Sequence, residues 1–312
     1  MDKKLIEALV HLDKVTKEKR LHLEDSKDIP YGVQQEYSFL DEKGKINIYY
    51  SANKDRISFT VSSKSEAMKK RLNEVIIKQQ TMSFPPQITD LHCWKSWVGS
   101  DESGKGDYFG PLVVTAFYCR YEDIIPLREM GVKDSKELKD SQIDIIAKKV
   151  MARYPNNYQQ IVLVPSKYNE LYGRFKESKK NLNHLLAWAH SKVISTLVRK
   201  FNPEGIFVDR FTKQNLVEYY LASEKCDNYD IIQAHQGERD VAVAAASILA
   251  RYKFSAGIEH YSKLYGVKLP KGGGAQTITA GKEFVKKCGE EKLNEVAKLH
   301  FKNSILINNS KE

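Results

Sequence analysis

The sequence has few cysteines, no long apolar run and no internal repeat. Its four cysteines, Cys93, Cys119, Cys226 and Cys288, lie far apart, without a C-x-x-C pair or a histidine at a zinc-binding spacing. This pattern excludes a disulfide framework and a structural zinc site, and it favours reduced thiols in the cytoplasm. The longest apolar run, residues 241–250, is far shorter than the ~20 residues that cross a bilayer, and the first 20 residues contain no signal-peptide core. We therefore expect a cytoplasmic protein that does not associate with membranes.

Positive charge is abundant. The chain of 312 residues contains 50 Lys and Arg against 40 Asp and Glu, a formal net charge of +10. Such a charge attracts polyanions and speeds their capture. Charge alone does not establish a nucleic-acid partner, because many basic proteins bind no polyanion specifically.

Residues 1–85 are predicted to form a small α+β domain. Helices are predicted for residues 2–20 and 65–79, and strands for residues 36–40, 45–51 and 56–62, with a turn at residues 52–55. The helical stripe of Leu5, Leu9, Leu12 and Val15 supports the first helix. Residues 86–95 are interpreted as a linker, because periodicity is lost around Pro85-Pro86.

Residues 96–312 are predicted to form a larger layered α/β domain with a mixed sheet, because strand and helix patterns alternate. The predicted strands are residues 96–101, 111–120, 160–165, 205–209 and 230–234, and the predicted helices are residues 141–154, 181–201 and 238–261.

Two adjacent carboxylates, Asp101 and Glu102, end the first of these strands and precede the turn Ser103-Gly104-Lys105-Gly106. Neighbouring negative charges repel unless a cation neutralises them or one stays protonated. A divalent-metal site explains the pair, since Mg²⁺ and Mn²⁺ prefer oxygen ligands. A simple turn, in which Asp and Gly are common, explains it equally well when this stretch is taken alone. Strand alternation also points the two side chains to opposite faces, unless the glycines relax it.

Further carboxylates lie at comparable places in the predicted domain. Asp209 ends an apolar strand, where catalytic side chains of layered α/β sheets often collect. Glu238 and Asp240 precede an apolar helix that we expect to be buried against the sheet, so either interacts with the helix dipole. Each acid, taken singly, also fits an ordinary capping role. Together, in a basic protein, they fit metal-assisted phosphodiester cleavage.

Four motifs in this order resemble type 2 ribonucleases H. They are Asp101-Glu102-Ser103-Gly104-Lys105-Gly106 with Gly110-Pro111, Asp134-Ser135-Lys136-Glu137-Leu138, Val208-Asp209-Arg210-Phe211, and an Ala-Ala-Ala-Ser-Ile-Leu-Ala-Arg helix. The match spans residues 93–304. Within the family the chain is most similar to bacterial ribonuclease HIII. Gly104-Lys105-Gly106 stands where ribonuclease HII has Gly-Arg-Gly, Asp107-Tyr108-Phe109 follows it, and a long domain precedes the catalytic one.

The resemblance implies a ribonuclease H-like mixed sheet flanked by helices, preceded by a TATA-binding-protein-like domain that helps to hold the substrate. It implies an endonuclease that uses Mg²⁺ or Mn²⁺ to hydrolyse the RNA strand of RNA/DNA hybrids. Asp101, Glu102 and Asp209 match the family's metal-binding carboxylates, and Glu238 fits the fourth position better than Asp240. In this hypothesis the four hold two ions. One ion activates the attacking water and the other stabilises the leaving 3′-oxygen, which leaves 5′-phosphate and 3′-hydroxyl ends.

The resemblance also implies substrate-binding residues. Gly104, Lys105 and Gly106 match a loop that lies along the minor groove near the scissile phosphate, where 2′-hydroxyls are accessible. Ser135 and Lys136 resemble a phosphate-contacting pair. A solvated surface lysine and an ordinary turn remain simpler interpretations of these positions. The expected partner is an RNA/DNA hybrid, and a monomer is expected.

Three alternatives stay open at this point. One is a ribonuclease HII-like enzyme that incises at single ribonucleotides in duplex DNA, and another is a non-catalytic hybrid-binding protein whose acids are structural. The third is a DNA-binding module in residues 1–90, which is weaker because these residues have 16 Lys and Arg against 14 Asp and Glu.

Overall fold

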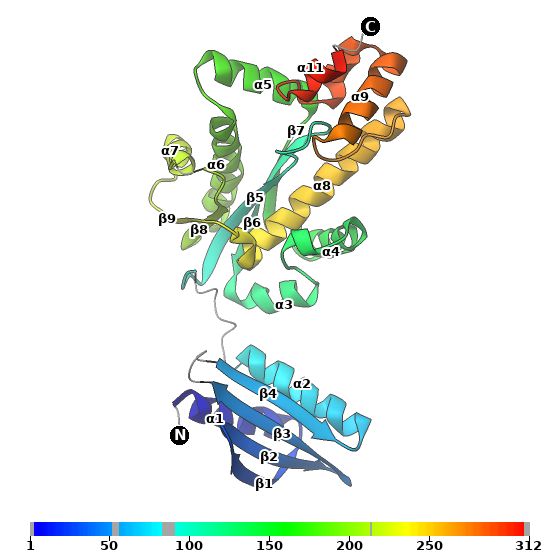
Figure 1. Ribbon diagram of the computed structural model, residues 1–312. Coiled ribbons are helices and arrows are strands. Elements are labelled where there is room, and N and C mark those ends of the chain that lie inside the picture. The colour runs from blue at the N-terminus through cyan, green and yellow to red at the C-terminus, as the bar shows by residue number, and fades with distance from the viewer. Residues whose placement is uncertain (1–2, 52–55, 83–90, 213, 309–312) are drawn as a thin grey trace. The chain divides into compact units, whose positions relative to one another are not determined.

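The computed structural model describes residues 3–51, 56–82, 91–212 and 214–308, and the chain divides into two compact units, Met1–Asp90 and Leu91–Glu312 (Figure 1). The turn predicted at residues 52–55 and residues 86–90 of the predicted linker lie outside the described residues.

The first unit is a four-stranded antiparallel sheet with two helices on one face. Its strands β1 (His22–Ile29), β2 (Gly32–Phe39), β3 (Glu42–Ser51) and β4 (Arg56–Ser63) pair in chain order, and its helices are α1 (Lys3–Glu18) and α2 (Glu66–Met82). The inward side chains of Ile46 and Ile48 pack with Leu12 and Leu72 of the helices. The small α+β domain that was predicted is therefore present, with an antiparallel sheet, but β1 was not predicted.

The second unit contains the mixed sheet that the sequence predicted, which confirms the fold class. Its strands are β5 (Ser96–Ser103), β6 (Leu112–Arg120), β7 (Tyr158–Leu163), β8 (Gly205–Asp209) and β9 (Asp230–Ala234). They lie in the order β7-β6-β5-β8-β9. The strands β5, β8 and β9 are parallel, whereas β6 is antiparallel to both of its neighbours.

Helices cover both faces of this sheet (Figure 1). One face packs against α6 (Leu182–Phe201) and α7 (Leu216–Ser223). The other face packs against α8 (Val241–Tyr265), which is flanked by α3 (Ile124–Glu129) and α4 (Asp140–Arg153). The remaining helices are α5 (Pro165–Glu177), α9 (Ala275–Cys288), α10 (Leu293–Val296) and α11 (Asn303–Asn308).

The helix α8 lies directly on β5. A Cβ atom at Gly99 of β5 would come within 2.3 Å of the Val243 backbone nitrogen, so only glycine permits this approach. The first ten residues of α8 are buried, as expected from their apolar and small side chains. By length and composition α8 is also apolar enough to cross a membrane, but here it is the central helix of a packed core.

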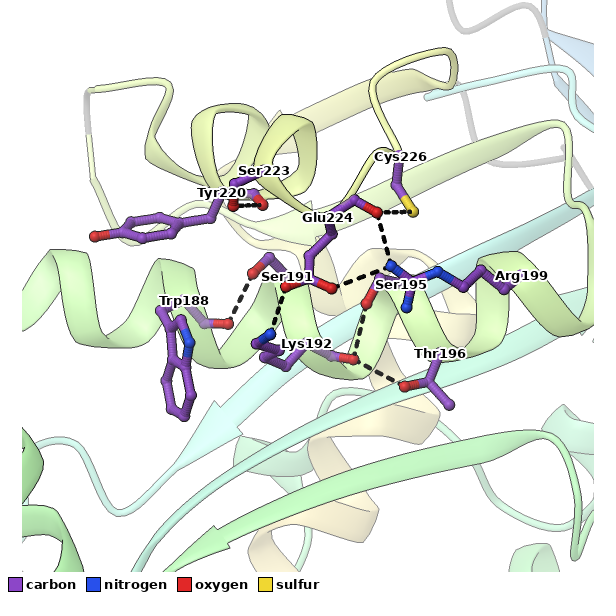
Figure 2. A network of polar contacts seen from close by, with 10 residues as sticks. All are labelled: Trp188, Ser191, Lys192, Ser195, Thr196, Arg199, Tyr220, Ser223, Glu224 and Cys226. Carbon is purple, nitrogen blue, oxygen red and sulfur yellow. Dashed lines mark hydrogen bonds and ion pairs between the residues drawn. The ribbon is translucent and has the colours of Figure 1, made fainter.

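The helices α6 and α7 are joined by charged contacts far from the carboxylates. Glu224, at the end of α7, accepts hydrogen bonds from Lys192 and Arg199 of α6 at 2.5 Å and 3.1 Å (Figure 2). The Arg199 guanidinium also donates to the Glu224 backbone oxygen at 2.7 Å. These contacts fix α7, and thereby the chain that leaves β8, against α6.

Candidate active site

Asp101 and Asp209 lie side by side at the carboxyl ends of two neighbouring parallel strands. Ser100 of β5 pairs with Val208 of β8, and the next residue on each strand is an aspartate. Residues that pair across parallel strands point to the same face of the sheet. Trp97 and Phe207, two or four residues earlier on these strands, pack on the α8 face, so both aspartates project toward α8.

Asp101 is buried and surrounded by negative charge. Its Oδ1 accepts a hydrogen bond from the Glu102 backbone N–H at 2.7 Å, and its carboxylate accepts another from the Ser247 hydroxyl. Burial raises the pKa of Asp101 well above its ordinary value, and the charges of Glu102 and Asp209 raise it further. Both burial and the neighbouring carboxylates therefore disfavour the charged form of Asp101 when no cation is bound.

Glu102 points to the opposite face of the sheet, so strand alternation holds through to Ser103. Its Oε2 lies 3.2 Å from Nε2 of His190 on α6, and its Oε1 lies 3.4 Å from Nζ of Lys105. Burial acts to raise the pKa of Glu102, but His190 and Lys105 outweigh it and the pKa is lowered. Glu102 is thus held as a carboxylate at the edge of the site.

His190 is a site residue that the sequence did not reveal. It is fully buried, its Nδ1 lies 2.7 Å from the Ser100 hydroxyl, and its ring stacks on Phe211 at 5.1 Å. The Ser100 hydroxyl donates to the Thr115 backbone oxygen, so it accepts from His190. A histidine on an apolar helix usually belongs to the core, and only its proximity to Glu102 in space marks it as part of the site.

Asp209 is held by the short helix η4 (Gly237–Arg239). Its Oδ1 accepts a hydrogen bond from the Gly237 backbone N–H at 2.8 Å. Burial raises the pKa of Asp209, the Gly237 hydrogen bond opposes this, and the charges of Glu238 and Glu102 raise it again. The charges of Glu102 and Glu238 therefore lie close enough to act on Asp209.

Glu238 and Asp240 have different environments. Glu238 is buried apart from its contact with Lys136, whose Nζ lies 2.5 Å from Glu238 Oε1. Asp240 caps α8 by accepting from the backbone N–H groups of Ala242 and Val243, and it also accepts from Trp97 Nε1 at 3.1 Å. Its other oxygen lies 3.2 Å from Nε2 of His92. Because Asp240 is fully engaged in the core, the geometry supports Glu238 as the fourth carboxylate.

The loop that carries Gly104, Lys105 and Gly106 follows Glu102 directly. Gly104 has a φ of +91°, and a Cβ there would lie 2.2 Å from the Pro111 backbone oxygen, so glycine is required. A Cβ at Gly106 would meet no atom within 4 Å, which leaves this backbone open to close approach. Lys105 reaches back to Glu102 and lies over the Phe211 ring.

Ser135 and Lys136 lie in the short helix η3 (Ser135–Glu137) and point in different directions. The Ser135 hydroxyl is buried and lies 2.9 Å from the hydroxyl of Ser247, which in turn donates to Asp101. Lys136 is largely exposed, and its hydrogen bond to Glu238 raises its pKa. Only Lys136 of the pair presents a charge near the carboxylates.

A buried lysine that the sequence did not single out anchors the rest of the loop. Lys298 is fully buried, and its Nζ donates to the backbone oxygens of Asp107 at 2.8 Å, Phe109 at 3.3 Å and Gly110 at 2.7 Å. Burial lowers the pKa of Lys298 to about 7. The glycine-rich stretch at residues 271–276 contacts the same loop, since the Gly272 N–H donates to Asp107 Oδ1 at 2.6 Å.

The donor set fits a hard divalent cation, because all four predicted ligands are carboxylates. Within the described residues, no three His, Cys, Asp or Glu side chains are grouped closely enough to form a metal site. Each glutamate contacts a lysine in this structure, Glu102 with Lys105 and Glu238 with Lys136. Lysine ammonium groups thus balance part of the charge that a cation would balance.

Comparisons with known proteins identify the family. The sequence profile of the ribonuclease HII family matches residues 98–304. A ribonuclease HIII of Protochlamydia amoebophila is 41% identical over 231 residues, which is 74% of this chain and 73% of the relative. A Bacillus cereus ribonuclease HIII is 44% identical over 214 residues, 67% of each chain.

Solved structures are also similar to this chain, over different shares of its length. The structure of Bst-RNase HIII in complex with Mn²⁺ has a TM-score of 0.63 and 30% identity, and the match covers 99% of this chain and 96% of that one. The ribonuclease H2 of Pyrococcus horikoshii OT3, with a TM-score of 0.56 and 23% identity over 69% of this chain and 97% of that one, shares the fold.

Proposed function

Because the chain belongs to the ribonuclease HII family, with ribonucleases HIII as its curated relatives, we propose that it is a metal-dependent endonuclease that hydrolyses the RNA strand of RNA/DNA hybrids. The observation that carries this proposal is the placement of Asp101 and Asp209 at the carboxyl ends of β5 and β8, with Glu102 and Glu238 near enough for their charges to raise the pKa of Asp209. The single-ribonucleotide alternative is not favoured, because the matched relatives are ribonucleases HIII.

The four carboxylates are proposed to hold two divalent ions, Mg²⁺ or Mn²⁺. A bound ion of this kind lowers the pKa of a coordinated water and stabilises charge on a leaving oxygen. The oxygen-only donor set supports this assignment, and so do the raised pKa values of Asp101 and Asp209, which result first from burial and then from the neighbouring carboxylates. The expected products carry 5′-phosphate and 3′-hydroxyl ends.

Residues around the carboxylates hold them in place. The Ser247 hydroxyl and the Glu102 N–H orient Asp101, and the Gly237 N–H orients Asp209. His190 fixes the Glu102 side chain from α6. These groups come from β5 and from the helical elements α6, α8 and η4, and they fix the orientations of Asp101, Glu102 and Asp209.

Lys105 and Lys136 are proposed to contact substrate phosphates once a cation replaces them at the glutamates. Both ammonium groups are at least partly exposed and lie beside the carboxylates. The open backbone at Gly106 supports a close approach of the loop to a groove of the hybrid. The Ser135 hydroxyl is buried against Ser247, so Ser135 is proposed to contact substrate through its backbone or to support the site through Ser247.

Residues 1–85 are proposed to form a TATA-binding-protein-like domain that helps to bind the hybrid. On the sheet face opposite α1 and α2, the Gln34 amide donates to Asn47 at 2.6 Å, and the Asn47 amide donates to Thr60 at 3.1 Å. This row of uncharged donors and acceptors suits contacts with sugars and bases rather than a purely electrostatic attraction. Changing Asn47 to Ala is expected to weaken hybrid binding while cleavage of bound substrate continues.

The proposal includes a monomeric protein in the cytoplasm. All four cysteines, which lie in the described part of the chain, are free, and Cys119 and Cys226 are buried. Free thiols are typical of a reducing compartment.

The test is cleavage of an end-labelled RNA/DNA hybrid by the full-length protein. We expect cleavage with Mg²⁺ or Mn²⁺, none with a chelator, and none by Asp101→Asn with either metal. A parallel duplex with one embedded ribonucleotide should be cut much more slowly. Binding of the hybrid without metal-dependent cleavage would instead identify a non-catalytic binding protein.

A further inference from the structure

A cleft of about 640 Å³ opens beside Glu238, between α3, η3 and the start of α8. Four basic side chains line it: Arg128, Lys133, Lys136 and Arg239. The cleft is continuous with the candidate active site, because Glu238 and Lys136 belong to both. Its charged lining makes an apolar ligand unfavourable, since such a ligand would desolvate these groups without replacing their hydrogen bonds.

The four basic side chains differ in how their charge is balanced. Lys133 pairs with Glu137 at 3.0 Å, and Lys136 pairs with Glu238. Arg128 and Arg239 are both exposed, and no side-chain hydrogen bond or ion pair joins either of them to the described residues. Two guanidinium groups therefore face the cleft with all their donors available. A guanidinium matches a phosphate in both charge and planar donor geometry.

The cleft lies on one side of the carboxylates, and the loop of residues 104–106 lies on the other. Lys105 contacts Glu102 on one side of the carboxylate cluster, and Lys136 contacts Glu238 on the other. A nucleic-acid strand with its reacting phosphate at the carboxylates would pass the loop of residues 104–106 on one side. On the other side it would enter the cleft.

We propose that this cleft binds backbone phosphates of the substrate on the side of the cut opposite the loop of residues 104–106, with Arg128 and Arg239 as the contacting residues. This inference rests on the proposed function and adds a binding site to it. It also explains why two arginines lie unpaired beside a cluster of acids.

The first experiment measures hybrid binding by the full-length protein in chelator, across salt concentrations from about 50 to 200 mM. Arg128→Gln and Arg239→Gln should each weaken binding about two- to fivefold, the scale of an exposed charge pair. Each change should also make the slope of log K against log salt shallower by about 1. Arg174→Gln, an exposed arginine on α5 that pairs with Glu170, is the matched control and should change neither quantity.

The second experiment uses hybrids that extend from the cut on one side only. The double variant Arg128→Gln/Arg239→Gln should show a raised KM with the substrate that fills the cleft, and a wild-type KM with the substrate that ends before it. An equal defect with both substrates, or no defect with either, would overturn the assignment. If the wild-type protein itself fails to cleave the hybrid with Mn²⁺, the proposed function fails instead, so the two failures are distinguishable.

Discussion

Replacing Asp209 with Asn should stabilise the metal-free protein while it abolishes hydrolysis. Asp101 and Asp209 follow paired residues on neighbouring strands, which lie about 5 Å apart. Two unit charges at that distance repel by roughly 3 kcal/mol at an effective dielectric constant of 20. Lys136 offsets part of this repulsion, so we expect a gain of about 1–2 kcal/mol. The Asn side chain keeps an oxygen that accepts from the Gly237 N–H.

The assay is thermal unfolding of wild type and variant at neutral pH, first in chelator and then with Mn²⁺. In chelator the variant should melt a few degrees higher, at roughly 2–4 °C per kcal/mol for a unit of this size. With Mn²⁺ the wild type should gain stability and the variant should gain much less, because one ligand is missing. Cleavage should fall by roughly a thousandfold or more.

A control and a refuting result complete this test. Asp144→Asn changes an exposed aspartate on α4 that pairs with Lys148, so it should leave the metal response and cleavage unchanged. If Asp209→Asn cleaves the hybrid at the wild-type rate, Asp209 is not a metal ligand. If it melts lower than wild type in chelator, the argument from charge repulsion is wrong.

Three further predictions follow from the same geometry. Because burial and neighbouring charges raise the pKa of Asp101, its contribution to metal-free stability is complete below its unfolded pKa near 3.8 and is lost as pH rises through the folded value. Asp101→Asn and the wild type should therefore unfold at the same urea concentration at pH 4. Toward pH 8 the variant should become increasingly more stable than the wild type. Glu238→Gln should remove cleavage without loss of stability, whereas Asp240→Ala should cost about 1–2 kcal/mol in urea unfolding, because it removes the side-chain oxygen that caps α8. Burial lowers the pKa of Lys298 to about 7, so between that pH and 10.5 the unfolded chain binds one more proton than the folded chain. The free energy of unfolding of the wild type should therefore rise through this window by at most about 1.4 kcal/mol per pH unit relative to Lys298→Met. If the two proteins instead show parallel curves of unfolding free energy against pH, the backbone oxygens keep Lys298 protonated.

Much of the catalytic sheet could be predicted because buried strands leave a clear apolar signal. The strands at residues 205–209 and 230–234 were predicted with the bounds that the structure has. The strand β1 was missed because its sequence, HLEDSKDI, has no alternation and its side chains are mostly exposed. Its position depends on backbone pairing with β2, which composition does not encode. The helix α5 was also missed, because Pro165 was assigned to a strand but occupies the first turn of the helix.

The carboxylates of the site could be predicted because they end strands or precede a core helix. Their surroundings could not be, since those contacts join residues far apart in the chain. His190 reaches Glu102 across 88 positions, and Lys298 reaches the Asp107 oxygen across 191. The helix 238–261 predicted from the sequence begins at Val241 instead, because Asp240 caps it and Glu238 lies in η4. The roles of the individual residues, and the division at residues 85 and 96, stay predictions.

The absence of a side chain at Gly99 has a consequence for how this protein tolerates change. The separation between β5 and α8 is set there by main-chain atoms of Ala242 and Val243 and by the Ala242 methyl group, with no larger side chain between the two elements. Substitutions that enlarge or shrink neighbouring core residues can be absorbed elsewhere along the 25-residue helix, while the end nearest the acidic cluster keeps its spacing. Sequences that diverge widely in their interiors can therefore preserve the same reaction centre.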